Sequence, residues 1–124
     1  MLASSILQTI IWTSRMAEAE KFYGEVLGLH LKARSHGALV YDVGGGDLRV
    51  SPVPSTQPSA HTVLGFAVAD IRTIVESLME RGIRFERIPG FSHDSMGILA
   101  TPDGSRVAWF RDPDGNLLSI VQYA

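Results

Sequence analysis

The sequence predicts an α+β fold built from two similar βαβββ modules, each with a strand, a helix and then mostly antiparallel strands that together form a cupped mixed sheet. Three observations lead to this fold class. β-rich and helical runs follow the same order in both halves of the 124 residues. The residues expected to cap the two helices, Ser14 and Asp70, are 56 positions apart. The glycines that end these helices, Gly28 and Gly82, are 54 positions apart, which indicates an internal repeat.

The first half starts with a β-rich run and continues into a helix. Ser14 offers an N-cap oxygen, and apolar residues then recur at helical spacing until Gly28, a natural residue to follow a helix. Strands are predicted at 6–12, 38–43 and 48–53. Residues 54–61 contain Pro and Ser and are predicted to be a linker.

The second half repeats this order. Asp70 is expected to cap a helix that carries its apolar residues on one face and ends at Gly82. Strands are predicted at 62–68, 83–88, 96–101, 106–110 and 117–123. The turn at 112–116 is expected to bind its own backbone amides through Asp and Asn side chains. We therefore expect one domain, 1–124, with module one at about 5–53 and module two at about 62–124.

Composition excludes several classes of protein. A chain of 13.5 kDa buries about two-thirds of its surface, so it can form a core without crosslinks. The absence of cysteine excludes a disulfide framework and a thiolate metal site. A net charge of −2 with no basic cluster argues against binding to nucleic acid. No basic leader and no long apolar run are visible, so we expect no membrane contact and a cytoplasmic location.

Three segments resemble the vicinal oxygen chelate superfamily, which includes glyoxalase I, bleomycin-resistance proteins, fosfomycin-resistance enzymes and extradiol dioxygenases. Residues 19–29 read AEKFYGEVLGL, residues 65–71 read GFAVADI, and residues 109–117 read WFRDPDGNL. The resemblance covers nearly the whole chain. It implies paired βαβββ modules of the glyoxalase/bleomycin-resistance type, usually in a homodimer whose two chains often complete each other's barrels.

The resemblance also implies where a metal would be held. Metal-dependent members place ligands on the first and last strand of each module, and spacing to the shared motifs maps these positions to Gln8, Leu64, Ser119 and the vicinity of Val50. Divalent cations such as Zn²⁺ are held by His and carboxylate ligands. Gln8 offers one carbonyl oxygen and Ser119 a weak neutral ligand, while the other two offer nothing. We therefore expect no metal, no other cofactor and none of the family's metal-dependent reactions.

The face that remains is apolar and aromatic, with a few polar points. Strand alternation, the resemblance and the rim predicted at 90–97 give the candidate ligand-binding residues Gln8, Ile10, Trp12, Arg49, Leu64, Phe66, His93, Met96, Val107, Trp109 and Ser119. Such a lining suits a flat, apolar small molecule held by stacking and one or two hydrogen bonds. It resembles the metal-free, bleomycin-resistance-like branch, whose members sequester a drug. The leading hypothesis is a homodimeric protein that binds a small apolar or aromatic molecule.

Two alternatives stay open. The first is a lyase, isomerase or dioxygenase-like enzyme of the same fold with a displaced or absent metal site. His93, with Asp94 and Ser95 in a flexible rim at 90–97, could form an acid–base group for it. The second alternative is a structural module whose interior is filled by its own side chains, in which case Trp12 and Trp109 are core residues.

Overall fold

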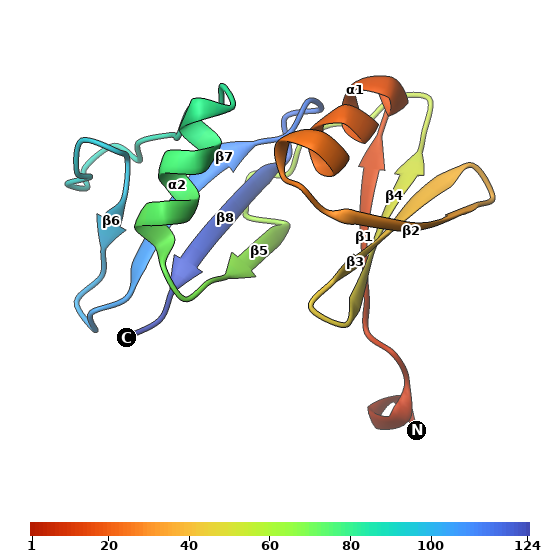
Figure 1. Ribbon diagram of the computed structural model, residues 1–124, viewed down its shortest axis with the longest axis horizontal. Coiled ribbons are helices and arrows are strands. Elements are labelled where there is room, and N and C mark those ends of the chain that lie inside the picture. Colours follow the sequence, from red (N-terminus) through yellow and green to blue (C-terminus); the bar gives the residue numbers. More distant parts are fainter. The chain divides into compact units, whose positions relative to one another are not determined.

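The computed structural model describes residues 1–124, and the chain divides into two compact units, Met1–Gln57 and Pro58–Ala124 (Figure 1). The division falls within the segment predicted to be a linker. Each unit contains one four-stranded mixed sheet with helical structure beside it. The α+β fold class is therefore confirmed.

Unit 1 has a sheet in which the first strand joins the last. Its strands are β1 (Gln8–Thr13), β2 (His30–Ser35), β3 (Ala38–Val43) and β4 (Gly46–Pro52). Its helical segments are η1 (Leu2–Ser4), α1 (Met16–Lys21) and the π-helical turn η2 (Phe22–Val26). The strand order is β1-β4-β3-β2, with β1 parallel to β4 and the other pairs antiparallel.

Unit 2 repeats this topology. Its elements are β5 (Leu64–Ala67), α2 (Ile71–Glu80), β6 (Leu99–Ala100), β7 (Arg106–Arg111) and β8 (Leu117–Gln122). The strand order is β5-β8-β7-β6, again with the first strand parallel to the last. The same βαβββ order in both units confirms the internal repeat predicted from the helix caps and glycines.

Each sheet buries one face under its own helical segment. In unit 1, the Tyr23 ring of η2 lies 6.2 Å from the Tyr41 ring of β3, and both side chains are fully buried. In unit 2, α2 lies against β7 and β8, as Figure 1 shows. The buried residues of this second core are Ile71, Val75, Leu78, Ala108, Phe110, Leu118 and Ile120. Below, the sheet face away from the helix is called the open face of each unit.

The second helix begins as expected and the first does not. The Asp70 carboxylate accepts the Thr73 N–H at 3.3 Å, and Gly82 follows α2 with φ of +92°, a conformation that glycine adopts without strain. In contrast, α1 starts one residue later than predicted, with Arg15 and not Ser14 in the N-cap position, and the Arg15 side chain makes no capping bond. The buried Thr13 hydroxyl accepts the Arg15 N–H at 3.0 Å and helps to shape this entry.

Two predicted strands of unit 2 are shorter than expected because they share one edge of β7. The Glu86 N–H donates to the Trp109 carbonyl at 2.8 Å, but residues 83–88 form only this isolated bridge. Further along the same edge, Leu99 and Ala100 pair with Val107 and Arg106, so the strand predicted at 96–101 is reduced to β6. Neither segment can extend along β7 without displacing the other.

The DPDGN turn forms as predicted. The Asp112 carboxylate accepts the N–H groups of Asp114 and Asn116, each at 2.9 Å, and the Asn116 side-chain amide donates to it at 2.9 Å. Asp112 and Asn116 are both buried. Gly115 has φ of +88°, which favours glycine at this corner. The Asp112 carboxylate, at the corner between β7 and β8, thus accepts its hydrogen bonds from groups within the turn itself.

Candidate functional site

The open face of unit 1 presents exposed apolar side chains. Along β1, Ile11 and Thr13 are buried, whereas Ile10 and Trp12 are 55% and 59% exposed. Gln8 lies on the same face, because successive strand residues alternate between the two sides. Register with β4 puts Arg49 opposite Ile10. The predicted grouping of Gln8, Ile10, Trp12 and Arg49 on one face is therefore observed.

The charged groups of this face are held by neighbours within unit 1. An Arg49 guanidinium nitrogen donates to the Ser35 carbonyl at 2.9 Å. The Lys32 ammonium lies 2.7 Å from the Asp47 carboxylate, and this hydrogen bond raises the pKa of Lys32. Because Arg49 is tied to the backbone and Asp47 is paired, the face offers mainly the apolar surface of Ile10 and Trp12.

The open face of unit 2 centres on two cross-strand pairs of residues. Trp109 of β7 lies opposite Ser119 of β8, and Val107 lies opposite Val121. All four are half-buried. Gly65 is opposite Ser119 on the other side of β8. The Trp109 indole, the Ser119 hydroxyl, the two valines and Gly65 thus share one accessible surface.

Leu64 and Phe66 are not on this face, contrary to the sequence prediction. They pair with Leu118 and Ile120, whose side chains are buried on the helix side. A shift of one residue in register turns every side chain of a strand to the other face. The open-face position next to them is Val63, whose N–H donates to the Leu117 carbonyl at 3.0 Å and continues the ladder.

His93 contacts Trp109, but its ring nitrogens bind backbone. Its Nε2 accepts the Ile88 N–H at 2.9 Å, and its Nδ1 lies 2.8 Å from the Gly97 carbonyl. The imidazole meets the Trp109 indole edge to face, with ring centroids 6.2 Å apart. The acid–base group predicted for His93 with Asp94 and Ser95 is not formed, because Asp94 binds elsewhere.

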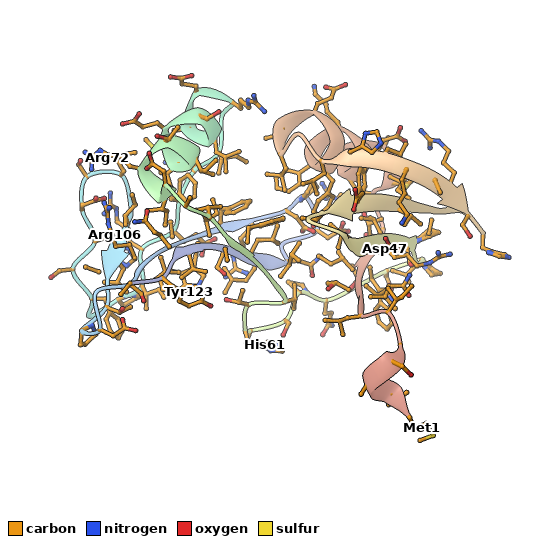
Figure 2. The ribbon with its side chains drawn as sticks, turned by 60° about the horizontal axis from the view of Figure 1, so that its bottom comes forward. Met1, Asp47, His61, Arg72, Arg106 and Tyr123 are labelled. Atoms are coloured by element: carbon orange, nitrogen blue, oxygen red, sulfur yellow. The ribbon has the colours of Figure 1, made fainter.

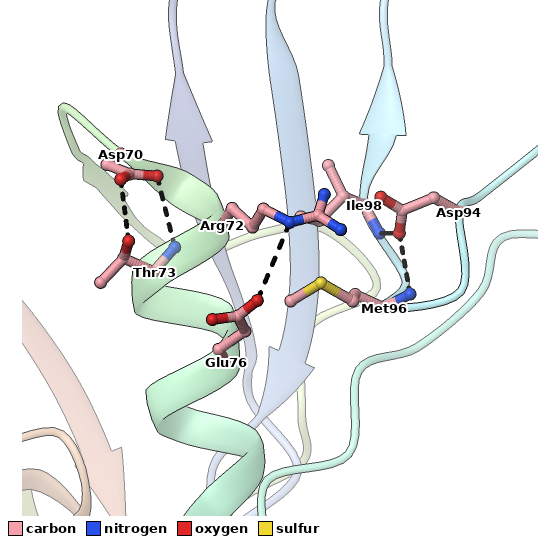
Figure 3. Close-up of polar contacts among 7 residues, drawn as sticks. All are labelled: Asp70, Arg72, Thr73, Glu76, Asp94, Met96 and Ile98. Carbon is pink, nitrogen blue, oxygen red and sulfur yellow. Dashed lines mark hydrogen bonds and ion pairs between the residues drawn. The ribbon is translucent and has the colours of Figure 1, made fainter.

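The loop that carries His93 and Met96 is held by several hydrogen bonds. The Asp94 carboxylate accepts the N–H groups of Met96 and Ile98, each at 2.9 Å (Figure 3). The Arg87 guanidinium donates to the carbonyls of Asp94 and Ser95 at 2.8 and 3.2 Å. The segment 90–97, which the sequence predicts to be a flexible rim, is thus held by hydrogen bonds to Asp94, Ser95 and Met96.

The residues at the four mapped metal positions do not fit a divalent cation. Val50 is fully buried on the helix side of its sheet, and Leu64 faces the helix side of the other. Val63, which takes the open-face place, is apolar. Gln8 and Ser119 leave one amide and one hydroxyl as the only donors at these positions. No three His, Asp or Glu side chains come together anywhere in the chain in a way that could hold a metal ion.

A separate depression of about 390 Å³ lies in unit 1, among residues of α1, η2, β2 and β3. Its lining consists of Ala17, Glu20, Lys21, Gly24, Glu25, Leu31 and Tyr41, none of which is a predicted ligand-binding residue. The Tyr41 hydroxyl is buried and has no hydrogen-bond partner. Burial raises its pKa, the Glu20 carboxylate raises it further, and Arg34 opposes both.

The N-terminal segment adds apolar surface to unit 1. Leu2, Ile6 and Leu7 are all highly exposed. In Figure 2, Met1 lies at the far end of this segment, beyond the start of the sheet. No helix of the chain is both long enough and apolar enough to cross a membrane.

These observations define a class: a chain of two βαβββ units, each a mixed sheet with its helix on one face and its first and last strands parallel. Residues 5–120 match the family described as the Glyoxalase/Bleomycin resistance protein/Dioxygenase superfamily, and the chain belongs to this superfamily. The resemblance carried by the FY and DPDGN segments is thereby confirmed.

Solved structures share the fold at low sequence identity. A glyoxalase family protein from Bacillus anthracis is 18% identical with a TM-score of 0.77, covering 98% of this chain and 96% of its own. Lactoylglutathione lyase from Agrobacterium tumefaciens is 20% identical with a TM-score of 0.72, covering 96% and 93%. A glyoxalase/bleomycin resistance protein/dioxygenase from Nocardioides is 21% identical with a TM-score of 0.71, covering 96% and 83%. No curated protein matches the sequence.

Proposed function

We propose that this protein binds a small apolar or aromatic molecule on the open faces of its sheets, without a metal ion. The observation that carries the proposal is the pair of Trp109 and Ser119, which places an accessible indole beside a hydroxyl on one face. An aromatic ligand stacks on an indole, and one hydrogen bond to a hydroxyl fixes its orientation. On unit 1, the Trp12 indole and the Gln8 amide share one face of β1, with Ile10 between them.

A homodimer is part of the proposal. Large apolar side chains at Ile10 and Trp12 lie on the open face of unit 1, and Leu2, Ile6 and Leu7 are also exposed in the segment before β1. Monomeric proteins rarely expose contiguous apolar patches larger than a few hundred Å². A second copy that covers part of this surface removes it from water and encloses the bound molecule.

An enzyme of the same fold is the alternative function. Its chemistry would require a free acid or base beside the open face. His93 is the titratable side chain in contact with Trp109, and both of its ring nitrogens are engaged by backbone groups. Since no other observation favours catalysis, we put binding first.

Ligand screening tests the proposal directly. We expect members of a panel of aromatic metabolites and antibiotics to raise the melting temperature, because a ligand at 100 times its Kd adds about 2.7 kcal/mol to the free energy of unfolding. The variants Trp12→Phe and Trp109→Phe each leave one tryptophan, so fluorescence quenching shows which face is occupied. A panel without any stabilising compound would contradict the proposal.

Metal titration tests the second part of the proposal, that the protein binds its ligand without a metal ion. In calorimetry with Zn²⁺, Mn²⁺ and Ni²⁺, we expect no tight binding at one ion per site, because the mapped positions lack His and carboxylate ligands. The engineered variant Gln8→His serves as a comparison, since it adds one strong ligand but still leaves the set incomplete. Tight stoichiometric binding to the unmodified protein would overturn the metal-free assignment.

A further inference from the structure

The hydrogen bonds of His93 fix its protonation state. The Ile88 N–H donates to Nε2, so Nε2 carries a lone pair, and Nδ1 carries the proton that is donated to the Gly97 carbonyl. Only the neutral imidazole can accept at one nitrogen and donate at the other. We propose that His93 is a proton-sensitive latch: when neutral it holds residues 88–97 beside Trp109, and a second proton releases them and weakens ligand uptake at the open face of unit 2. The uptake part rests on the proposed function.

Protonation acts at one bond. The imidazolium carries N–H groups at both nitrogens, so Nε2 would direct a proton at the Ile88 N–H, only 2.9 Å away. That bond is lost, while the bond from Nδ1 to Gly97 survives. The contact between the imidazole and the Trp109 indole changes with it, because the ring is no longer held from the Ile88 side.

The other bonds of the loop do not respond in the same pH range. Burial of the Asp94 carboxylate favours its neutral form, but the N–H groups of Ile98 and Met96 outweigh this and lower the pKa of Asp94. Asp94 therefore stays ionised while imidazole titrates. Arg87 stays charged at every relevant pH and keeps its two carbonyl partners. His93 is thus the one member of this network whose two hydrogen bonds together require a neutral side chain, so that one of them is lost when it gains a proton.

Several charged groups from the surrounding elements lie around this network. The carboxylate is Asp94, on the loop itself. The cations are Arg87 before the loop, Arg72 of α2 and Arg106 of β7, and the last two help to lower the pKa of Asp94. Figure 3 shows Arg72 on α2 near Asp94. Glu86 is neutralised by Arg111 of β7 at 2.6 Å.

Gly97 leaves the loop little freedom to compensate. Its φ is +92°, and a Cβ there would lie 2.9 Å from the Phe85 Cβ, so the acceptor of the Nδ1 bond sits at a point of close backbone approach. A loop fixed at this point cannot shift to give Nε2 a new acceptor without opening. Loss of the Ile88 bond therefore loosens the segment instead of rearranging it.

Fluorescence of Trp109 in a Trp12→Phe background tests the latch without any ligand. Between pH 7.5 and 5 we expect one reversible change in emission that fits a single proton. In the His93→Gln protein the amide oxygen accepts from Ile88 and the amide nitrogen donates to Gly97, so emission should stay at the latched value. His93→Ala should give the released value throughout. The control His61→Gln, which replaces an exposed histidine of unit 2, should keep the transition.

The results decide between clear alternatives. A transition that persists in His93→Gln, or its absence from the parent protein, overturns the latch. For uptake, calorimetry with 2-naphthol should show about 10-fold weaker binding at pH 5 than at pH 7.5, the loss expected for about one hydrogen bond, and no change in His93→Gln. Unchanged affinity alongside a clear emission transition overturns the link to uptake. If 2-naphthol and the panel fail to bind at either pH while the transition remains, the proposed function fails and the latch stands.

Discussion

Gly65 and Ser119 lie opposite each other across β5 and β8, so close that a Cβ on Gly65 would come within 3.0 Å of the Ser119 Oγ. The missing side chain leaves the hydroxyl free to turn toward the open face of unit 2. A larger residue at 65 would have to displace it. Glycine at this position thus keeps the surface beside Trp109 accessible.

We expect Gly65→Ala to turn the Ser119 hydroxyl away and to weaken ligand binding. The cost in stability should be about 1 kcal/mol or less, because the crowded atom is the end of a side chain that can rotate. Thermal unfolding and probe titration measure the two effects. In a Ser119→Ala background the same change should cost less, since the crowded oxygen is gone. An equal penalty in both backgrounds would show that the crowding involves some other group.

Replacing Trp12 with serine should weaken self-association. Trp12 is exposed in the single chain, so Trp12→Ser should change the unfolding free energy of the monomer by no more than about 0.5 kcal/mol. If the open face of unit 1 is a dimer contact, loss of an indole from it should weaken the dimer about 10-fold or more. Sedimentation equilibrium measures the constant. Met79→Ser, on an exposed part of α2, is the matched control and should leave association unchanged.

Asp112→Ala should be strongly destabilising. The change removes the acceptor of two backbone N–H groups and of the Asn116 amide, and it leaves buried donors without partners. We expect a loss of about 3 kcal/mol in chemical denaturation, near the upper end for one such group because several donors are affected. Asp112→Asn keeps one acceptor oxygen and should lose less. Equal losses for the two variants would mean that shape, and not hydrogen bonding, holds the turn.

Tyr41→Phe should stabilise the protein. The substitution removes a buried hydroxyl that has no partner, so the unfolding free energy should rise by about 1 kcal/mol. The benefit should grow at alkaline pH. Burial raises the pKa of Tyr41 in the folded chain, so above about pH 10 the unfolded chain ionises first and the parent protein loses stability.

Comparing the parent protein with the Tyr41→Phe variant isolates the effect of Tyr41 ionisation on the unfolding free energy. The ion pair of Lys32 with Asp47 also weakens at alkaline pH, but it is present in both and cancels from the difference. Denaturation of both proteins between pH 8 and 11 measures the difference in their unfolding free energies. A difference that stays constant across this range would contradict the burial of the Tyr41 hydroxyl.

The sequence was sufficient to predict the repeated βαβββ order, although not every strand in it, together with the Asp70 cap and the DPDGN turn. Each depends on local chemistry: apolar periodicity, a carboxylate one residue before a helix, and side chains that bind their own backbone. For the same reason the faces of β1 were predicted correctly, since Ile11 and Thr13 are buried and Trp12 is not.

The orientation of β5 and the presence of the edge strand β2 could not be predicted from local chemistry. Both faces of β5 follow an apolar pattern, so alternation alone does not say which of them faces the helix, and Leu64 and Phe66 were placed on the wrong side. The strand β2, His30–Ser35, was not predicted, because an edge strand rich in charged residues carries no apolar signal. The role of His93 depends on Ile88 and Gly97, whose backbone groups leave no trace in residue type.

The parallel pairing of first and last strands has a consequence for the order in which the chain can fold during synthesis. In each unit, the strand made first has no partner until the strand made last has left the ribosome, because β1 pairs only with β4 and β5 only with β8. Closing such long loops is slow, and the waiting strand exposes apolar residues such as Ile10 and Trp12. A nascent chain halted before β4 should therefore be protease-sensitive, and one extended past residue 57 should already hold unit 1 in a resistant form.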